Sequence, residues 1–254
     1  IQFPLGIFGV ALATAILPTL SAQAARGALD ELRTTIGFGL RMIFFIILPA
    51  MLGLILLRHP IVHLVFEHGS FTKADTVATA TALLCYAVGL WAFAGVRIIV
   101  SAFYSLQDTR TPAVTAGRAA GASILLSLWL MTLLDAAGLA LATALASMLN
   151  GSILVAVLHR RLGRVDWGSI VWSAFRVLGA CIPVAVMCLW VANASLWDQD
   201  GAWVVKSAAL FGGIGVSVIG YLGVHIMLGS EELDVVLGMV KRKLGRVAKK
   251  FGAA

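Results

Sequence analysis

One stretch of the chain carries polar and ionisable side chains in a helical pattern within apolar sequence. Residues 77–104 are long and apolar enough to cross a bilayer, and Arg97 interrupts them. Steps of three or four residues from Arg97 reach Ser101, Tyr104 and Asp108 on one helix face. An ionisable group in hydrocarbon costs about 2.5–3.5 kcal/mol even on the lenient insertion scale. We therefore expect this face to border a protein interior or a watery path, where the guanidinium would attract a phosphate or carboxylate. The alternative is that Arg97 snorkels to the lipid headgroups.

A second group of possible ligands precedes this stretch. His59, His63 and Glu67 share a helix face, with His68 beside it. Histidines four residues apart could hold a metal ion, but a further ligand would have to come from elsewhere in the chain. Ordinary histidines at the membrane interface explain the pattern better, so we expect no metal and no cofactor.

The turn that follows the apolar stretch is the third candidate site. It contains Gln107, Asp108, Arg110 and Pro112. Asp108 and Arg110 could pair within the turn, or the turn could act as a hinge contact between helix bundles. Turn chemistry alone also explains these residues.

The sequence offers no set of residues for catalysis. It contains neither HExxH nor GxSxG, and its Asp and Glu residues fall in the expected loops and helix ends. We therefore do not expect an enzyme.

Composition places the chain in a membrane. It is 60% hydrophobic and 12% charged, whereas a soluble domain usually has about 25% charged residues. The formal net charge of +7 favours contact with anionic lipid headgroups rather than with nucleic acid. The three cysteines all fall in apolar runs, where we expect small core residues rather than disulfides.

The apolar runs predict an all-α integral membrane protein with about seven transmembrane helices and a C-terminal amphipathic helix. A first span would occupy residues 1–25, six more would lie within 26–228, and a basic tail would form 229–254. Residues 59–70 are too short to span and predict an interfacial helix, and Thr72 and Asp75 resemble a capping box. Residues 230–250 have helical apolar spacing and predict a helix on the membrane surface. The expected spans are 3–25, 36–57, 77–104, 113–134, 139–158, 167–192 and 203–228.

Charge asymmetry orients these spans. Of the nineteen Lys and Arg residues, fifteen fall on one side of the expected membrane, three on the other, and Arg97 lies between. The positive-inside rule assigns the side with fifteen to the cytoplasm, together with the C-terminus. Seven spans then put Ile1 outside. Because the chain begins without Met, we expect it to be the C-terminal part of a longer protein.

Several motifs resemble one family of transporters. FYSLQDTRTP at 103–112, following GVRIIVSA, is similar to the cytoplasmic end of the tenth helix of MurJ/MviN-type lipid II flippases. These belong to the multidrug/oligosaccharidyl-lipid/polysaccharide exporter superfamily and have fourteen helices in two lobes. The resemblance makes this chain helices eight to fourteen. Supporting segments are QFPLGIFGVALATAILPTLS at 2–21, LRMIFFIILPAMLGL at 40–54 and LVFEHGSFTKADT at 64–76.

The resemblance implies a function in the bacterial inner membrane. It implies alternating access that carries lipid II, an undecaprenyl-pyrophosphate-linked disaccharide-pentapeptide, from the cytoplasmic to the periplasmic leaflet. Arg97 matches a position that is basic in the family, and Gln2, in the first matching segment, joins Arg97, Ser101 and Tyr104 as candidates for the substrate path. The last two spans would form a groove for the polyprenyl tail.

The resemblance also defines partners and alternatives. The partners would be lipid II and anionic membrane lipids, with cell-wall synthesis proteins as further candidates. Other cavity arginines of the family lie mostly in the first lobe, so we expect that this chain alone does not flip lipid II. The alternatives are a lobe of a related polysaccharide or drug exporter, or a membrane scaffold without transport.

Overall fold

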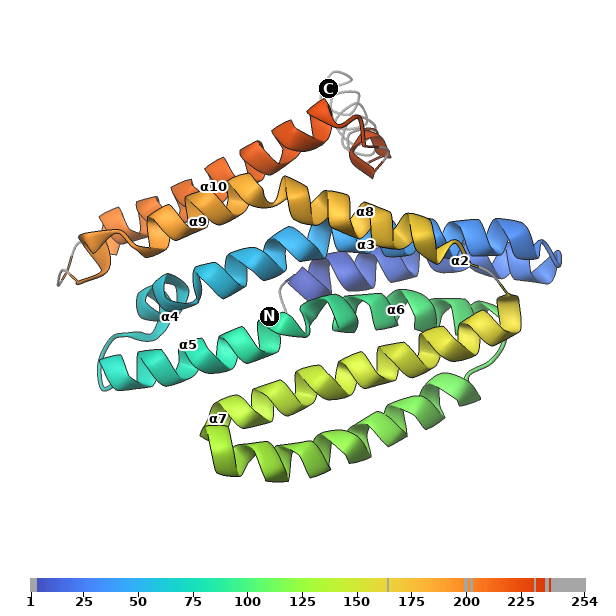
Figure 1. The fold of residues 1–254 in the computed structure, drawn as a ribbon, viewed down its shortest axis with the longest axis horizontal. Coiled ribbons are helices and arrows are strands. Elements are labelled where there is room, and N and C mark those ends of the chain that lie inside the picture. Colours follow the sequence, from blue (N-terminus) through green and yellow to red (C-terminus); the bar gives the residue numbers. More distant parts are fainter. Residues whose placement is uncertain are drawn as a thin grey trace, which may run out of the picture.

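The structure, a computed structural model, describes residues 4–163, 165–198, 201, 203–230, 232–235 and 238. Every named element in this part of the chain is a helix (Figure 1). The described part starts with a π-helix, η1, and contains one 3₁₀ helix, η2. In chain order the elements are η1 (Leu5–Val10), α2 (Ala11–Ala25), α3 (Leu29–Leu56), α4 (Arg58–Phe66), α5 (Lys73–Val88), α6 (Leu90–Ser105), α7 (Arg110–Leu162), α8 (Trp167–Ala180), α9 (Ile182–Ala192), η2 (Ser195–Asp198) and α10 (Trp203–Met227).

The described helices supply seven candidate membrane spans. Five continuous helical segments are long and apolar enough, namely η1 with α2, α3, α5 with α6, α7, and α10. The pair α8 and α9, bent by 41°, adds a sixth. Because α7 folds back on itself (Figure 1), its two arms count separately and give the seventh. The expectation of an all-α membrane protein with about seven spans is confirmed.

The reversal within α7 depends on two residues at its tip. Asp135 has a positive φ of 48° and a non-helical ψ of −131°. At Gly138 an added Cβ would lie 2.2 Å from the carbonyl oxygen of Leu130, so the second arm can start here only without a side chain. A tight turn therefore joins the expected spans 113–134 and 139–158, and its geometry excludes larger residues at Gly138.

The expected single helix over 77–104 is wrong in detail. Two helices, α5 and α6, meet at Gly89. A Cβ at Gly89 would lie 2.6 Å from the Cβ of Ala144 in the second arm of α7, so the junction is also a close helix crossing. The capping box at the start of α5 is confirmed, because Thr72 and Asp75 each accept a hydrogen bond from the other's backbone N–H.

Helix α3 lies between two packed clusters. One joins it to α2, α6, the second arm of α7 and the start of α8, with Ile36, Ile43 and Phe103 among the fully buried side chains. The other joins it to the rest of α8, α9 and α10. The α8–α10 layer therefore packs on the bundle mainly through α3, as Figure 1 shows.

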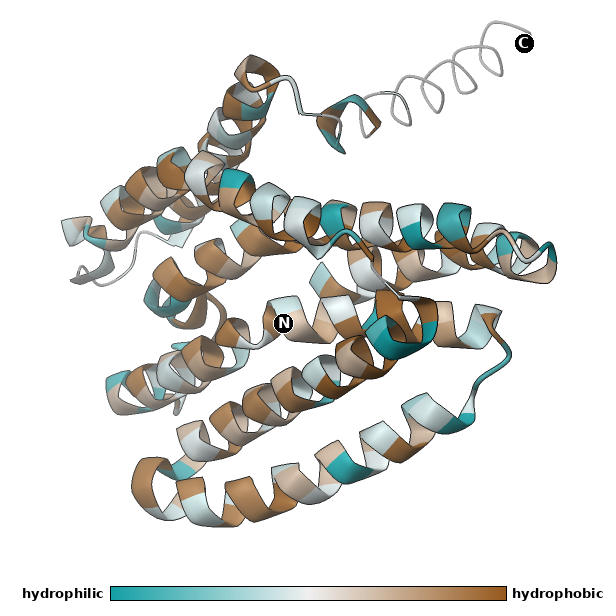
Figure 2. Cartoon of the chain, turned by 45° about the vertical axis from the view of Figure 1, so that its right-hand side comes forward, coloured by the Kyte–Doolittle hydropathy of each residue, from teal (hydrophilic) through white to brown (hydrophobic). Residues whose placement is uncertain are grey.

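Large apolar side chains also cover much of the outer surface. Along the first arm of α7, Leu125, Leu128 and Trp129 are each more than 60% exposed. Figure 2 shows hydrophobic residues along the length of the helices, with many hydrophilic ones near the connections. A chain with such a surface needs lipid as its solvent.

The beginning of the tail departs from the expectation of a helix on the membrane surface. Glu232 and Leu233 are buried, and Leu233 packs in the cluster of α3, α8, α9 and α10. The apolar spacing of the tail gave no reason to bury a carboxylate. The other expected tail residues lie almost entirely outside the described part of the chain.

Candidate functional site

The side chain of Arg97 lies against the π-helix at the start of the chain. A Cβ on Gly9 would be 3.3 Å from Cδ and 3.7 Å from Nε of Arg97, so the missing side chain of Gly9 makes room for the arginine. Arg97 is half-buried on α6, which packs against both η1 and α2. Helices of the π type are rare and often mark functional positions. The geometry thus places the arginine at a contact between spans.

The other members of the predicted polar face differ in exposure. Ser101 is buried, and its hydroxyl donates to the carbonyl of Arg97 at 3.1 Å. Tyr104 is 49% exposed. Gln2, the fourth candidate for the substrate path, lies outside the described residues. The bond from Ser101 is the usual one of a helical serine to the carbonyl four residues earlier, and it does not involve the Arg97 side chain.

The turn between α6 and α7 is an ion-paired connection. Asp108 contacts Arg161, at the end of the second arm of α7, with 2.6 Å between Oδ2 and the guanidinium. The ion-pair partner that the structure gives Asp108 is thus Arg161, at the far end of α7, whereas the sequence suggested Arg110 within the turn. Hydrogen bonds from the hydroxyl and N–H of Thr111, together with the charge of Arg161, lower the pKa of Asp108.

The remaining turn residues fix the ends of the helices. Gln107 has a positive φ of 59° and lies exposed after α6. Pro112 is buried near the start of α7, where its missing N–H leaves no helical hydrogen bond unmade. Arg110 is exposed at the first position of α7.

An apolar groove of about 520 Å³ lies between α3, α4, α9 and α10, with η1 at one side. This volume is within the range of about 300–1,000 Å³ typical of ligand sites. We call it the apolar groove. Its lining is Pro4, Phe8, Phe45, Ile46, Pro49, Ala50, Gly53, Leu54, Leu57, Ile61, Val184, Cys188, Ile214, Ser217, Val218, Tyr221 and Leu222.

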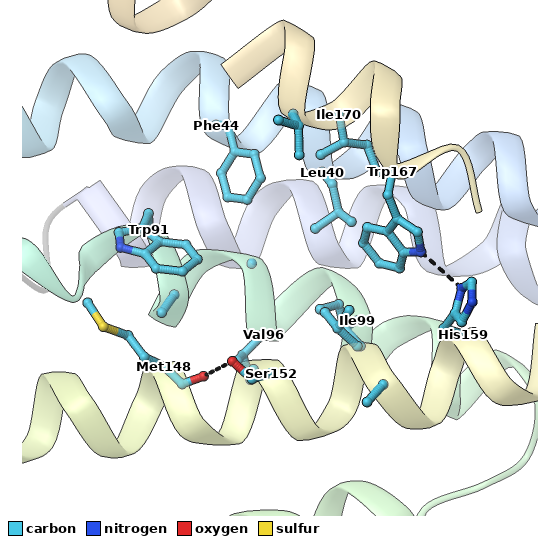
Figure 3. Close-up of a pocket in the computed structure, with 16 residues that line it drawn as sticks. Leu40, Phe44, Trp91, Val96, Ile99, Met148, Ser152, His159, Trp167 and Ile170 are labelled. Atoms are coloured by element: carbon cyan, nitrogen blue, oxygen red, sulfur yellow. Dashed lines mark hydrogen bonds between the residues drawn. The ribbon is translucent and has the colours of Figure 1, made fainter. Parts of the chain in front are cut away.

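A second cavity, of about 560 Å³, opens between α3, α6, α8 and the second arm of α7. Figure 3 shows Trp91 at one end and the pair Trp167 and His159 at the other, where the indole N–H donates to Nδ1 of His159 at 3.2 Å. Phe44 and Ile170 line the wall between them. The lining is almost entirely apolar, so this cavity suits hydrocarbon rather than a charged group.

A polar cluster joins the end of α4 to α10. The sequence analysis named His63 and Glu67 but missed Lys206, which completes the cluster. Nδ1 of His63 is 2.8 Å from Glu67, and Nε2 of His63 is 2.9 Å from the ammonium of Lys206. The Thr76 hydroxyl donates to the same Glu67 oxygen at 2.7 Å. Lys206, near the start of the expected span 203–228, is only 4% exposed.

Both ring nitrogens of His63 have partners in this cluster, and within the described part of the chain no group of three His, Cys, Asp or Glu residues could hold a metal ion. No local signal predicts the contact with Lys206, because 143 positions separate it from His63.

A second unpredicted cluster surrounds Glu232. The hydroxyl of Ser173 on α8 donates to its carboxylate at 3.0 Å, and Arg41 on α3 lies 4.0 Å from the same oxygen. Nearby, Nδ1 of His225 is 2.9 Å from the hydroxyl of Ser230. These contacts tie the segment after α10 to α3 and α8.

Comparisons with known proteins agree on one family. The family model described as "Lipid II flippase MurJ" matches residues 1–211. A probable lipid II flippase MurJ of Vibrio cholerae serotype O1 is 34% identical over 242 residues, which cover 92% of this chain and 45% of that protein. One of Rhizobium meliloti is 32% identical over 246 residues, covering 95% of this chain and 45% of that protein. This chain thus spans about half the length of these relatives.

A solved structure has the same fold. It is described as "Lipid II flippase MurJ, inward closed conformation" and superposes with a TM-score of 0.68 at 23% identity. The match covers 90% of this chain and 45% of that one. The resemblance expected from the motifs is confirmed.

Proposed function

Since this chain belongs to the MurJ family of lipid II flippases, we propose that it forms the C-terminal part of a transporter that moves lipid II between the leaflets of a bacterial membrane. The protein would work by alternating access, with this chain as helices eight to fourteen. It contributes binding surface and motion rather than a catalytic group.

The apolar groove carries this proposal. A polyprenyl chain is a long hydrocarbon, and it needs an apolar channel that stays open beside the path of its polar head. The groove lies between α9 and α10 on one side and α3 and α4 on the other, and it reaches η1 through Pro4 and Phe8. It is the place where the tail would be held during transport.

Arg97 is our candidate for the path of the pyrophosphate. It lies close to the groove along η1, because Phe8 borders the groove and the next residue, Gly9, contacts Arg97. Neighbouring residues of one π-helix thus touch both features. A lipid whose tail occupies the groove would bring its charged head toward this helix, where a guanidinium can make charge-assisted hydrogen bonds to phosphate.

We place the turn with Asp108 and Arg161 in the cytoplasm, together with the C-terminus. The excess of Lys and Arg on that side supports this orientation. Anionic lipid headgroups would then lie beside the exposed arginines of the cytoplasmic ends, such as Arg110 and Arg160.

A chimera tests the proposal. The matching half of the Vibrio cholerae relative is replaced by this chain, and the chimera is tested for lipid II transport in proteoliposomes and for growth of cells depleted of their own flippase. Val218 lines the groove and is 50% exposed, while Val216 is 53% exposed and does not line it. We expect Val218→Trp to lower transport about tenfold, as a loss of about 1.4 kcal/mol would, and Val216→Trp to leave it unchanged.

Two outcomes would overturn the proposal. One is a chimera that reaches the membrane in folded form but transports no lipid II. The other is equal transport by the two tryptophan variants, because a bulky side chain in the groove would then not hinder the lipid.

A further inference from the structure

The second cavity is separate from the apolar groove. Leu40 and Phe44 of α3 line the second cavity, whereas Phe45 and Ile46 of the same helix line the groove, and no described residue lines both. Its volume of about 560 Å³ is also within the range of about 300–1,000 Å³ typical of ligand sites. The role proposed for the groove therefore leaves a second hollow of ligand size without an occupant.

The second cavity opens toward the lipid that surrounds the helices. Val171 on α8 is 53% exposed, Trp91 on α6 is 39% exposed, and both line the cavity. Ala156, on the second arm of α7, also lines it and is exposed. A hydrocarbon chain can therefore enter sideways from the bilayer.

The length of the second cavity matches the depth of one leaflet. Met148 and His159 both line it on the second arm of α7, and a rise of about 1.5 Å per residue puts them about 16 Å apart. Figure 3 shows Met148 on the side of Trp91 and His159 at the other end. Half of a hydrocarbon core of about 30 Å is about 15 Å. The cavity thus spans the depth that one acyl chain of a phospholipid occupies.

The end of the cavity at His159 carries a hydrogen-bond donor. The indole N–H of Trp167 donates to Nδ1 of His159, so the ring proton of the neutral imidazole lies on Nε2. His159 is exposed and lies in the last turn of α7, at the level where a span ends. A lipid phosphate is an acceptor at this level, and a tryptophan is common there.

The same end carries an excess of positive charge. Residues 159–167 contain three arginines and one aspartate. Asp108 pairs with Arg161, and Asp166 caps the start of α8, so both carboxylates already have partners. Arg160 is exposed next to His159. These charges favour an anionic headgroup over a zwitterionic one.

We propose that the second cavity binds one acyl chain of an anionic phospholipid, whose phosphate accepts a hydrogen bond from Nε2 of His159 and lies beside Arg160. The lipid fills the space between the start of α8 and the bundle and so joins the outer layer to it. This site does not rest on the proposed function, because it lies apart from the groove and needs only a chain that spans a membrane.

Photo-crosslinking locates the lipid. The full 254-residue chain is reconstituted in phosphatidylcholine nanodiscs with a constant, small fraction of phosphatidylglycerol that carries a diazirine in one acyl chain. Labelled residues are mapped by mass spectrometry. We expect strong labelling of Met148 and Val155 in the cavity, which falls when unlabelled phosphatidylglycerol replaces phosphatidylcholine. Labelling of Leu125 and Leu128, exposed on the first arm of α7, should stay constant, because it reports bulk lipid.

A matched pair of variants tests entry into the cavity. Val171→Trp narrows the cavity, whereas Val186→Trp lies at a 64% exposed position of α9 that does not line it. We expect Val171→Trp to lower labelling in the cavity about tenfold, as the loss of about two buried methylene groups would. Val186→Trp should label like the parent chain.

A second set of variants tests the polar end and does not depend on how Val171→Trp folds. Arg160→Gln should lower the preference for phosphatidylglycerol over phosphatidylcholine about fivefold, the usual effect of one cation near a membrane surface. Arg118→Gln, at an exposed position on the first arm of α7, should not change it. His159→Ala should weaken labelling in the cavity, and His159→Gln, which keeps an N–H donor, should restore it.

Three results would overturn the proposal. One is labelling of the cavity that is no stronger than that of Leu125 and Leu128, or that unlabelled phosphatidylglycerol does not reduce. Another is an equal effect of each variant and its control. The third is displacement of the photolipid by a polyprenyl phosphate at lower concentration than by phosphatidylglycerol, which would assign the cavity to the transported lipid. Transport itself does not enter this experiment, so the site can fail while the proposed function stands, and the reverse also holds.

Discussion

Arg97 is the residue on which the proposed mechanism depends most. Its aliphatic part lies along Gly9, and the buried hydroxyl of Ser101 is bonded to its backbone. An arginine that only snorkelled would need neither a glycine opposite it nor a neighbouring span. The packing against η1 therefore favours a role between helices.

We predict that the charge of Arg97 is needed for transport. In the chimera with the Vibrio cholerae relative, Arg97→Gln keeps much of the length but loses a charged hydrogen-bonding partner worth about 1.5–3 kcal/mol. The transport rate should fall about 10–100-fold. Arg97→Lys should be intermediate, because an ammonium keeps the charge but not the planar fork.

The control for Arg97 is Arg118→Gln, at an exposed cation on the first arm of α7. It should transport like the parent chimera. If Arg97→Gln does the same, the substrate-path hypothesis for this residue is refuted.

At the level of single residues, the sequence reveals charged side chains in unusual surroundings, but it does not reveal their partners. Arg97 stood out because its neighbours are apolar, and Asp108 because it follows an apolar helix. Lys206 did not, since a lysine near the start of a helix is an ordinary loop-side charge. Its partner His63 and the partner of Asp108, Arg161, are distant in sequence and brought near only by packing.

At the scale of helices, Pro49 and Tyr221 form an interdependent pair. Pro49 lies inside α3 and has no N–H to give to the carbonyl of Phe45, four residues earlier. The hydroxyl of Tyr221 on α10 donates to that carbonyl at 2.7 Å. One helix thus supplies the hydrogen bond that another lacks, which also fixes α10 on α3 beside the apolar groove.

This pairing predicts a non-additive mutant cycle. Tyr221→Phe leaves a buried carbonyl unsatisfied and should lower the free energy of unfolding by about 1–3 kcal/mol. In a Pro49→Ala background the N–H of residue 49 can satisfy the same carbonyl, so the cost of Tyr221→Phe should be clearly smaller. Reversible unfolding in detergent micelles measures all four proteins.

Equal costs in the two backgrounds would contradict the idea that Tyr221 replaces the hydrogen bond missing at Pro49. Ser207→Ala is a suitable control. Its hydroxyl bonds to a carbonyl of its own helix, so its cost should be the same with either residue at position 49.

The helices themselves were largely predictable, because their apolar runs are long and their turns are marked by Gly, Pro and charged residues. The junction at Gly89 was not. Its cause is Ala144 in another helix, and a single glycine in an apolar run carries no sign of such a crossing. The burial of Glu232 was equally hidden, since Arg41 and Ser173 come from helices far away in the chain.

At the scale of the whole molecule, the two packed clusters divide the chain into a bundle and an outer layer. The bundle contains Arg97, whereas the outer layer, α8 to α10, closes the apolar groove. Helix α3 belongs to both. A lipid with a charged head and a long tail would thus meet the bundle with its head and the outer layer with its tail.

Alternating access requires two bodies that move against each other, and this chain spans about half the length of its relatives. We therefore predict that the 254-residue chain alone, reconstituted in proteoliposomes, does not transport lipid II. Its groove should still bind the tail, so a fluorescent polyprenyl phosphate should bind the parent chain and bind Val218→Trp more weakly. Fluorescent lipid II in the inner leaflet, followed by quenching from outside, measures transport, and the Vibrio cholerae relative serves as the positive control. Transport by the isolated chain would show that one half of the fold provides a complete path, and the two-lobe mechanism would then be wrong for this protein.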